Sequence, residues 1–327
     1  MEVVNPISIY VLLNMQLFDT SKNSINQSVG VIDDHSIYIK REDMLHPVVS
    51  GNKFRKLNFI FQEIVEQQID VALTFGGAFS NHLAATACAG KLMGIKTLGI
   101  VRGEEWQNKI SESNTLSYCA SMGMQLYCIS RSAYAEKEAA EEVQTILKQH
   151  SNYRLIPEGG TEALAVKGCT EILNPKDSSF DVICTSVGTG GTLAGLVQGA
   201  SEQQTVIGFN ALKNPQVNVF VSNQTQQRNW EINEDYTFGG YAKITPALID
   251  FMNTFYEQYQ IPLDPVYTGK MLFAIFDLIK KKQWRWGKHI LAIHTGGLQG
   301  VPGMNRQLQK KKLPVLKDFS TGTLALT

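Results

Sequence analysis

The chain has 327 residues, enough for one large or two moderate domains with well-buried cores. Lysine plus arginine and aspartate plus glutamate number 30 each, so no overall charge points to nucleic acid, an anionic membrane or a polyanionic substrate. Five widely spaced cysteines lie in apolar runs without metal-ligand spacing. This pattern predicts buried free thiols in a reducing compartment and no metal site.

An apolar stretch at residues 7–13 lies near the start of the sequence. It lacks the basic flank before it and the small-residue cleavage site after it that export would need. No apolar run approaches the roughly 20 residues needed to span a bilayer. We therefore expect a cytoplasmic protein that does not associate with a membrane.

Along the rest of the chain, the sequence pattern predicts alternating helices and strands. Just after Lys53, the residues Leu57, Ile60, Phe61 and Ile64 fall at i, i+3, i+4 and i+7, which predicts an amphipathic helix. From about residue 70, short β-branched runs alternate with segments of helical period, which is typical of a parallel sheet covered by helices. The predicted strands are residues 70–75, 96–102, 125–130, 180–186 and 289–294. The predicted helices are residues 81–93, 112–122, 133–149, 246–259 and 270–282, with another beginning at Leu193.

A glycine-rich turn joins the predicted strand at residues 180–186 to the helix from Leu193. The turn consists of Gly188, Thr189, Gly190, Gly191 and Thr192. Its glycines bring backbone N–H groups close to a ligand, and the helix N-terminus adds partial positive charge, so the turn can hold a phosphate. It has neither the lysine of a nucleoside-triphosphate loop nor dinucleotide-binding spacing. The alternative is a tight turn without a ligand.

A basic cluster of Lys53, Arg55 and Lys56 opens the first predicted helix. The positive potential at a helix N-terminus favours the neutral amine of Lys53, and a neutral lysine is a nucleophile towards aldehydes. Cations in a first turn oppose the helix dipole, so the cluster calls for a compensating anion such as phosphate. The alternative is a solvated basic turn.

Another strand-to-helix turn, residues 76–82, carries the polar side chains of Ser80, Asn81 and His82 together. A serine or asparagine there is explained equally well as a helix N-cap. The three side chains could instead bind a substrate carboxylate and a phenolate oxygen.

In their order and separations, these motifs resemble the fold-type II pyridoxal-phosphate enzymes, in the branch of 1-aminocyclopropane-1-carboxylate deaminase and D-cysteine desulfhydrase. The resemblance covers most of the chain, from about residue 39 to residue 297. The matching segments are KRED (40–43), SGNKFRKL (50–57), GGAFSNH (76–82), PEGGT (157–161), GTGGT (188–192), DPVYTGK (264–270) and HTGG (294–297).

This resemblance implies pyridoxal 5'-phosphate as cofactor and a small amino acid as substrate. Lys53 matches the lysine that carries the cofactor as a Schiff base, and Lys56 matches a residue near its phosphate. Asn81 matches the residue that hydrogen-bonds the pyridine hydroxyl, and Ser80 one at the substrate carboxylate. The matched active-site tyrosines are Tyr241 and Tyr267.

The fold that the resemblance implies is α/β, with two open, twisted, mostly parallel sheets flanked by helices. A small domain would span residues 55–160, and a large cofactor-binding domain residues 1–54 and 161–327. The cofactor would lie in the cleft between them. The resemblance also implies a homodimer.

Two positions favour the desulfhydrase-like branch. Thr268 and Thr295 stand where the deaminase-like pattern has glutamate and leucine. A threonine hydroxyl leaves the pyridine ring nearer neutral than a carboxylate would, and the weaker electron sink suits loss of a good leaving group such as a thiol. Which of the two threonines reaches the ring is open. Phe79 departs from the family, which has glutamine there.

The sequence thus predicts β-elimination on D-cysteine, giving pyruvate, sulfide and ammonia. The alternatives are 1-aminocyclopropane-1-carboxylate deaminase, a dehydratase or racemase on serine-like substrates, and a non-catalytic pyridoxal-phosphate-binding protein. A sheet-and-helix module whose glycine turns bind nothing is the remaining alternative.

Overall fold

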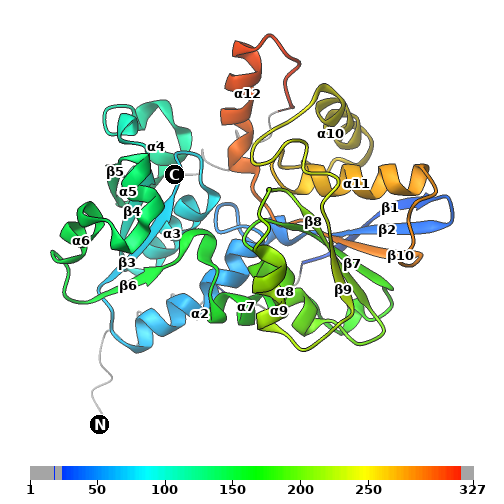
Figure 1. Ribbon diagram of the computed structural model, residues 1–327, viewed down its shortest axis with the longest axis horizontal. Coiled ribbons are helices and arrows are strands. Elements are labelled where there is room, and N and C mark those ends of the chain that lie inside the picture. Colours follow the sequence, from blue (N-terminus) through cyan, green and yellow to red (C-terminus); the bar gives the residue numbers. More distant parts are fainter. Residues whose placement is uncertain (1–17, 19–23, 318–327) are drawn as a thin grey trace.

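The computed structural model describes residue 18 and residues 24–317. The apolar stretch at residues 7–13 lies outside this part. The strands form two separate sheets, seen on opposite sides of the molecule in Figure 1, with helices packed against both. This arrangement confirms the predicted fold class of two open, mostly parallel sheets.

The larger sheet has six strands in the order β1-β2-β10-β7-β8-β9. A hairpin of β1 (Asn26–Ile32) and β2 (His35–Lys40) forms one edge, and all other neighbouring strands are parallel. The other strands are β7 (Val182–Val187), β8 (Thr205–Asn210), β9 (Trp230–Asn233) and β10 (His289–Ile293). The strands predicted at residues 180–186 and 289–294 are thereby confirmed as β7 and β10.

Helices cover both faces of this sheet. Successive side chains of a strand point to opposite faces, so Val182 and Cys184 of β7 join one core and Ile183 the other. The first face packs against α10 (Pro246–Tyr259), α11 (Thr268–Lys280) and α12 (Val301–Lys310). The second face packs against α7 (Ala163–Thr170), α8 (Gly191–Gly199) and α9 (Val217–Gln224). None of the helices in the described part is long and apolar enough to cross a membrane.

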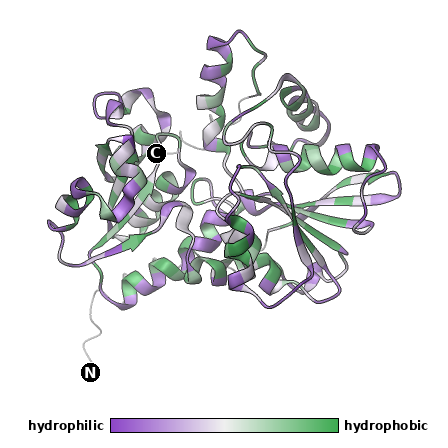
Figure 2. Ribbon diagram, in the orientation of Figure 1, coloured by the Kyte–Doolittle hydropathy of each residue, from purple (hydrophilic) through white to green (hydrophobic). Residues whose placement is uncertain are grey.

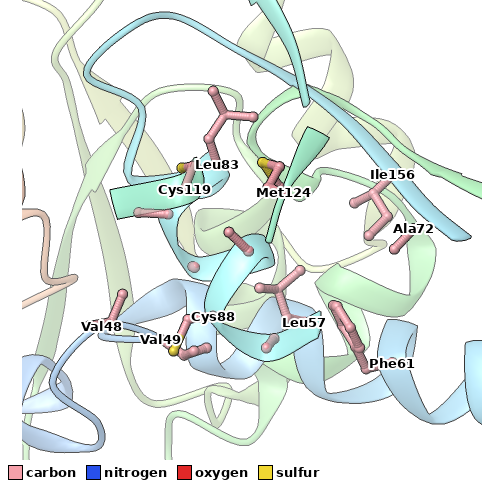
Figure 3. Packing of buried hydrophobic residues seen from close by; sticks show 14 of the residues in the cluster. Val48, Val49, Leu57, Phe61, Ala72, Leu83, Cys88, Cys119, Met124 and Ile156 are labelled. Carbon is pink, nitrogen blue, oxygen red and sulfur yellow. The ribbon is translucent and has the colours of Figure 1, made fainter. Parts of the chain in front are cut away.

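The smaller sheet has four parallel strands in the order β5 (Gln125–Ile129), β4 (Lys96–Arg102), β3 (Val71–Gly76) and β6 (Tyr153–Ile156). One face packs against α2 (Asn52–Glu66), α3 (Asn81–Met93) and α4 (Asn114–Ser121). Leu57 and Phe61 of α2 and Leu83 and Cys88 of α3 all belong to this core (Figure 3). The other face packs against α5 (Arg131–Glu136) and α6 (Glu141–Leu147).

The amphipathic pattern of α2 is confirmed. Leu57, Ile60, Phe61 and Ile64 are all fully buried, and the helix alternates apolar and polar patches along its length (Figure 2). The long helix predicted at residues 133–149 is wrong, because the chain breaks at Lys137, which has a positive φ of 56°. Apolar residues keep helical spacing on both sides of Lys137, so the sequence pattern alone did not reveal the break.

The cysteines are all free, as predicted. Four are buried and contribute to the cores, namely Cys88, Cys119, Cys169 and Cys184, whereas Cys128 on β5 is only partly buried.

The chain crosses from the larger to the smaller sheet through α2 and returns through α7, and the two helices pack tightly together. At Gly168 of α7, an added Cβ would lie 2.0 Å from the backbone oxygen of Arg55 on α2. Only glycine permits an approach this close. The two crossings between the sheets therefore form one compact junction.

Candidate active site

A cleft opens between the two sheets, where the N-terminal ends of α2, α3, α8 and α11 converge. Helix N-termini carry partial positive charge, so their convergence favours an anionic ligand. The predicted site residues that line the cleft are Lys53, Lys56, Asn81, Gly188, Thr189, Gly190, Thr192, Tyr267 and Thr295. The predicted residues outside its lining are Ser80, His82, Gly191, Tyr241 and Thr268.

The glycine-rich turn follows β7 and leads directly into α8, as predicted. Gly190 takes a left-handed φ of 93°, and no side chain in the described part of the chain caps the first N–H groups of α8. An added Cβ at Gly191 would lie 3.2 Å from Nζ of Lys56, so the turn and this lysine face each other. The amide of Asn52 donates to Oγ1 of Thr192 over 2.9 Å, tying the start of α2 to the turn.

The basic cluster of α2 divides into two parts. Arg55 turns away and forms a buried ion pair with Glu42 at 2.8 Å, so its compensating anion is a protein carboxylate rather than a ligand. Lys56 is buried, and its Nζ donates to the carbonyl of Gly159 and the hydroxyl of Thr161, both at 3.2 Å. Within the described residues, neither Lys56 nor Lys53 forms an ion pair with a carboxylate.

Lys53 lies in the first turn of α2, with Nζ 3.4 Å from Oδ1 of Asn52. Burial, together with the nearby charge of Lys56, lowers the pKa of Lys53 to about 7. The sequence had indicated a neutral amine because of the helix N-terminus. In the structure the largest cause is desolvation by burial, followed by the charge of Lys56.

Uptake of the cofactor by protein stripped of it is expected to accelerate as pH rises through about 7 and then to level off. Below this pKa Lys53 is an ammonium ion without a free electron pair, and above it the neutral amine can attack an aldehyde. Stopped-flow absorbance at a series of pH values measures the profile. In Lys56→Gln the midpoint should move to higher pH, because the neighbouring charge is gone. A wild-type rate that climbs steadily towards the ordinary lysine pKa of 10.5 contradicts the interpretation.

The turn after β3 presents Asn81 to the cleft. Its Oδ1 is buried and has no hydrogen-bond partner among the described residues, which leaves it available to a ligand. Ser80 caps α3 by accepting the N–H of Leu83 at 3.3 Å. His82 lies beneath the turn, fully buried, with Nε2 2.8 Å from Oγ1 of Thr74. His82 is therefore not part of the cleft lining, although it lies within electrostatic range of Lys53 and Lys56.

The two threonines that mark the branch are placed differently. Thr268 is buried in the first turn of α11, where its hydroxyl accepts the N–H of Asp264 at 2.9 Å. Thr295 lines the cleft, with Oγ1 3.4 Å from Oγ of Ser186. The geometry therefore favours Thr295 as the hydroxyl that faces a ligand.

Asp264 shapes the start of α11. Its carboxylate accepts the backbone N–H groups of Val266, Tyr267 and Thr268 at 2.8–3.0 Å. These bonds direct Tyr267 into the cleft, where an added Cβ at Gly188 would lie 3.1 Å from its ring. The Tyr267 ring thus sits directly against the glycine-rich turn.

Tyr241 is 52% exposed and lies within electrostatic range of Tyr267. Its segment is held by Lys270, a buried residue that the sequence reasoning did not assign. The Lys270 ammonium donates to the carbonyls of Gly240, Thr237 and Ala211 at 2.7, 2.9 and 3.2 Å. The sequence analysis also assigned no role to Asn52 or Thr161. Like Lys270, both lie within the segments that match the family.

The cleft fits a phosphorylated aldehyde with a polar ring. An uncapped helix N-terminus and the buried Lys56 suit the phosphate, and a lysine of lowered pKa suits the aldehyde. The unpartnered oxygen of Asn81 supplies a polar contact within the same space. These residues define the site of an enzyme that uses pyridoxal phosphate.

Comparison with known proteins agrees. The family model described as "Pyridoxal-phosphate dependent enzyme" matches residues 26–296. A Pyrococcus furiosus protein, provisionally named 1-aminocyclopropane-1-carboxylate deaminase, is 30% identical over 85% of this chain and 88% of its own. The Arabidopsis thaliana bifunctional D-cysteine desulfhydrase/1-aminocyclopropane-1-carboxylate deaminase is 30% identical over 83% of this chain and 75% of its own.

A solved structure, described as an ACC deaminase homologue, superposes with a TM-score of 0.78 at 25% identity, covering 94% of this chain and 99% of its own. The chain belongs to the 1-aminocyclopropane-1-carboxylate deaminase/D-cysteine desulfhydrase family of fold-type II pyridoxal-phosphate-dependent enzymes, and pyridoxal phosphate is its cofactor.

Proposed function

We propose that the protein catalyses β-elimination on D-cysteine, giving pyruvate, sulfide and ammonia. The observation that carries this proposal is that, among the residues that the structure describes, no aspartate or glutamate lines the cleft, whereas Thr295 does. Without a carboxylate at the ring nitrogen the electron sink is weaker. A weaker sink suits loss of a good leaving group such as a thiol, with a reference pKa of about 8.5.

When bound, pyridoxal phosphate supplies the electron sink for the electrons of the Cα–H bond. In our proposal the glycine-rich turn and Lys56 hold its phosphate, Asn81 and Thr295 contact its ring, and Lys53 holds its aldehyde carbon. Lys53 then accepts the Cα proton, because its lowered pKa provides a neutral amine near pH 7.

Other side chains are proposed to orient the substrate. The hydroxyl of Ser80, at the N-terminus of α3, binds the substrate carboxylate together with the helix dipole. Burial raises the pKa of Tyr267 above its ordinary value, so its hydroxyl remains protonated and can donate to the departing group. Tyr241 closes the mouth of the site.

The second candidate is 1-aminocyclopropane-1-carboxylate deaminase. It is favoured by the names of the similar Pyrococcus furiosus protein and of the solved ACC deaminase homologue. The lining of the cleft speaks against it, because ring opening of a carbocycle has no good leaving group and gains most from a strong electron sink.

A comparison of substrates distinguishes the two candidates. We expect the purified holoenzyme to release 2-oxo acid from D-cysteine with a kcat/KM at least about tenfold above that for aminocyclopropane carboxylate, which corresponds to roughly 1.4 kcal/mol of transition-state stabilisation. L-Cysteine and D-serine test chirality and leaving group in the same assay. A faster reaction with aminocyclopropane carboxylate would transfer the assignment to the second candidate. A visible cofactor band without turnover of any amino acid would indicate a binding protein.

The domain bounds are part of the same proposal. We place the small domain at residues 55–160 and the large domain at residues 1–54 and 161–327, with the site in the cleft between them. We also propose a homodimer, which analytical ultracentrifugation of the holoenzyme would test.

A further inference from the structure

A second cavity, of about 620 Å³, lies beside the cleft at the carboxyl ends of β3 and β4. Ligands of open parallel sheets bind at this end of the strands. No described residue lines both the cavity and the cleft, but two chain segments run from one lining to the other. Gly77 and Phe79 belong to the turn that presents Asn81, and Glu158 immediately precedes Gly159 of the cleft lining. Its volume falls within the roughly 300–1,000 Å³ of small-molecule sites and far exceeds what the side chain of cysteine fills.

The charges around this cavity leave one cation without a carboxylate. Lys137 pairs with Glu158 at 2.6 Å, and Arg131 pairs with Glu105. Arg102 forms no ion pair or hydrogen bond with any carboxylate of the described residues. The cavity therefore presents a guanidinium that a ligand anion can neutralise.

Arg102 is placed to reach a ligand that extends from the cleft. It is the exposed last residue of β4, at the carboxyl end of this largely buried inner strand. Its guanidinium carbon lies 5.9 Å from the ring centre of Tyr134. An added Cβ at Gly77 would lie 3.7 Å from its Nη2, so the side chain lies alongside the turn that leads to Asn81. It is also within electrostatic range of Tyr241.

We propose that this cavity is a subsite for an anionic group at the end of the substrate's β-substituent, and that Arg102 binds this group. Guanidinium donors match the oxygens of carboxylate, sulfonate and phosphate in a bidentate manner. The inference rests on the proposed β-elimination. The substrate class is an amino acid whose Cβ carries, through sulfur or oxygen, a chain ending in such an anion.

The reaction on this class is the same elimination. The Cα proton passes to Lys53, and the bond from Cβ to sulfur or oxygen breaks with its electron pair leaving on that atom. Water completes the release of pyruvate and ammonia. For S-carboxymethylcysteine the products are pyruvate, ammonia and mercaptoacetate.

Two nearly isosteric probes test the subsite, namely S-carboxymethylcysteine, which carries an extra negative charge, and its neutral amide S-carbamoylmethylcysteine, each as both enantiomers. Affinity is measured from the visible absorbance of the holoenzyme, and kcat/KM from 2-oxo acid. We expect the carboxylate to bind more tightly than the amide. Arg102→Gln should lower the affinity for the carboxylate probe about 10- to 100-fold, which is the range of a charged hydrogen bond. The affinity for the amide probe should change little. Arg102→Lys should restore part of the preference.

The matched control is Arg131→Gln, which removes the same charge from the same cavity but from an arginine already paired with Glu105. This variant should lower the affinity for the carboxylate probe less than about fivefold. Equal losses in the two variants would overturn the assignment to Arg102. Equal affinity of wild type for the two probes overturns the subsite, while turnover of D-cysteine would still uphold the proposed function. Arg102-dependent binding without 2-oxo acid from any amino acid would uphold the subsite and remove the proposed function.

Discussion

In Lys53→Ala, turnover and the visible absorbance of the covalently held cofactor are expected to disappear together. Lys53 is proposed both to hold the cofactor and to accept the Cα proton, and its pKa of about 7 suits both tasks. Loss of a positioned base alone costs about 10²–10⁴-fold in rate, and loss of the nucleophile adds to it. Absorbance spectra and assays for 2-oxo acid measure the two effects on one sample.

Lys56→Ala is the matched control for this prediction, because it removes a buried lysine one turn further along the same helix. We expect it to weaken cofactor binding while the visible band returns at high cofactor concentration. If Lys53→Ala keeps both colour and turnover, the assignment of the cofactor-binding lysine is wrong.

Asp177→Ala is expected to destabilise the protein by about 3–5 kcal/mol, because it leaves the charge of Lys40 buried and unpaired. The two residues are each 1% exposed, and Nζ of Lys40 lies 2.8 Å from Oδ2 of Asp177. Asp177 also accepts the amide N–H of Asn26 at 2.7 Å and the backbone N–H of Asn174 at 2.8 Å. The midpoint of urea unfolding measures the loss.

The double variant Lys40→Met/Asp177→Leu distinguishes the cost of an unpaired Lys40 charge from the loss of the other contacts of Asp177. Apolar side chains of similar volume often replace a buried ion pair at little cost, so the double variant should be more stable than Asp177→Ala. A double variant no more stable than the single one would assign the loss to the contacts of Asn26 and Asn174 instead.

The fold was predictable where local pattern and tertiary environment agree. The stripe of α2 and the strands β3, β4, β7 and β10 follow from periodicity and from runs of β-branched residues. The strands β1, β2, β6, β8 and β9 were missed. In β1 only Val29 is buried, so this strand has little apolar pattern, and β6 and β9 are only four residues long. Lys137, at the break between α5 and α6, pairs with Glu158 from a distant part of the chain, a contact that local pattern does not contain.

The site was predictable as far as the motifs reach. The glycine-rich turn, Lys53 and Lys56 were identified from residue type and spacing, and the structure brings them together in one cleft. Glu42 neutralises the charge of Arg55 through a contact that forms only in the folded chain, so the sequence did not reveal this pairing. The same holds for Arg102, because an arginine at the end of a strand is ordinary until its neighbours are known.

The junction of α2 and α7 bears on the position of Lys53. An added methyl at Gly168 has no room against Arg55, so the two helices are in close backbone contact where the chain passes between the two sheets. The bond from Asn52 to Thr192 keeps the beginning of α2 with the glycine-rich turn. Lys53 follows Asn52 directly in the chain, so this bond also holds the lysine beside the glycine-rich turn.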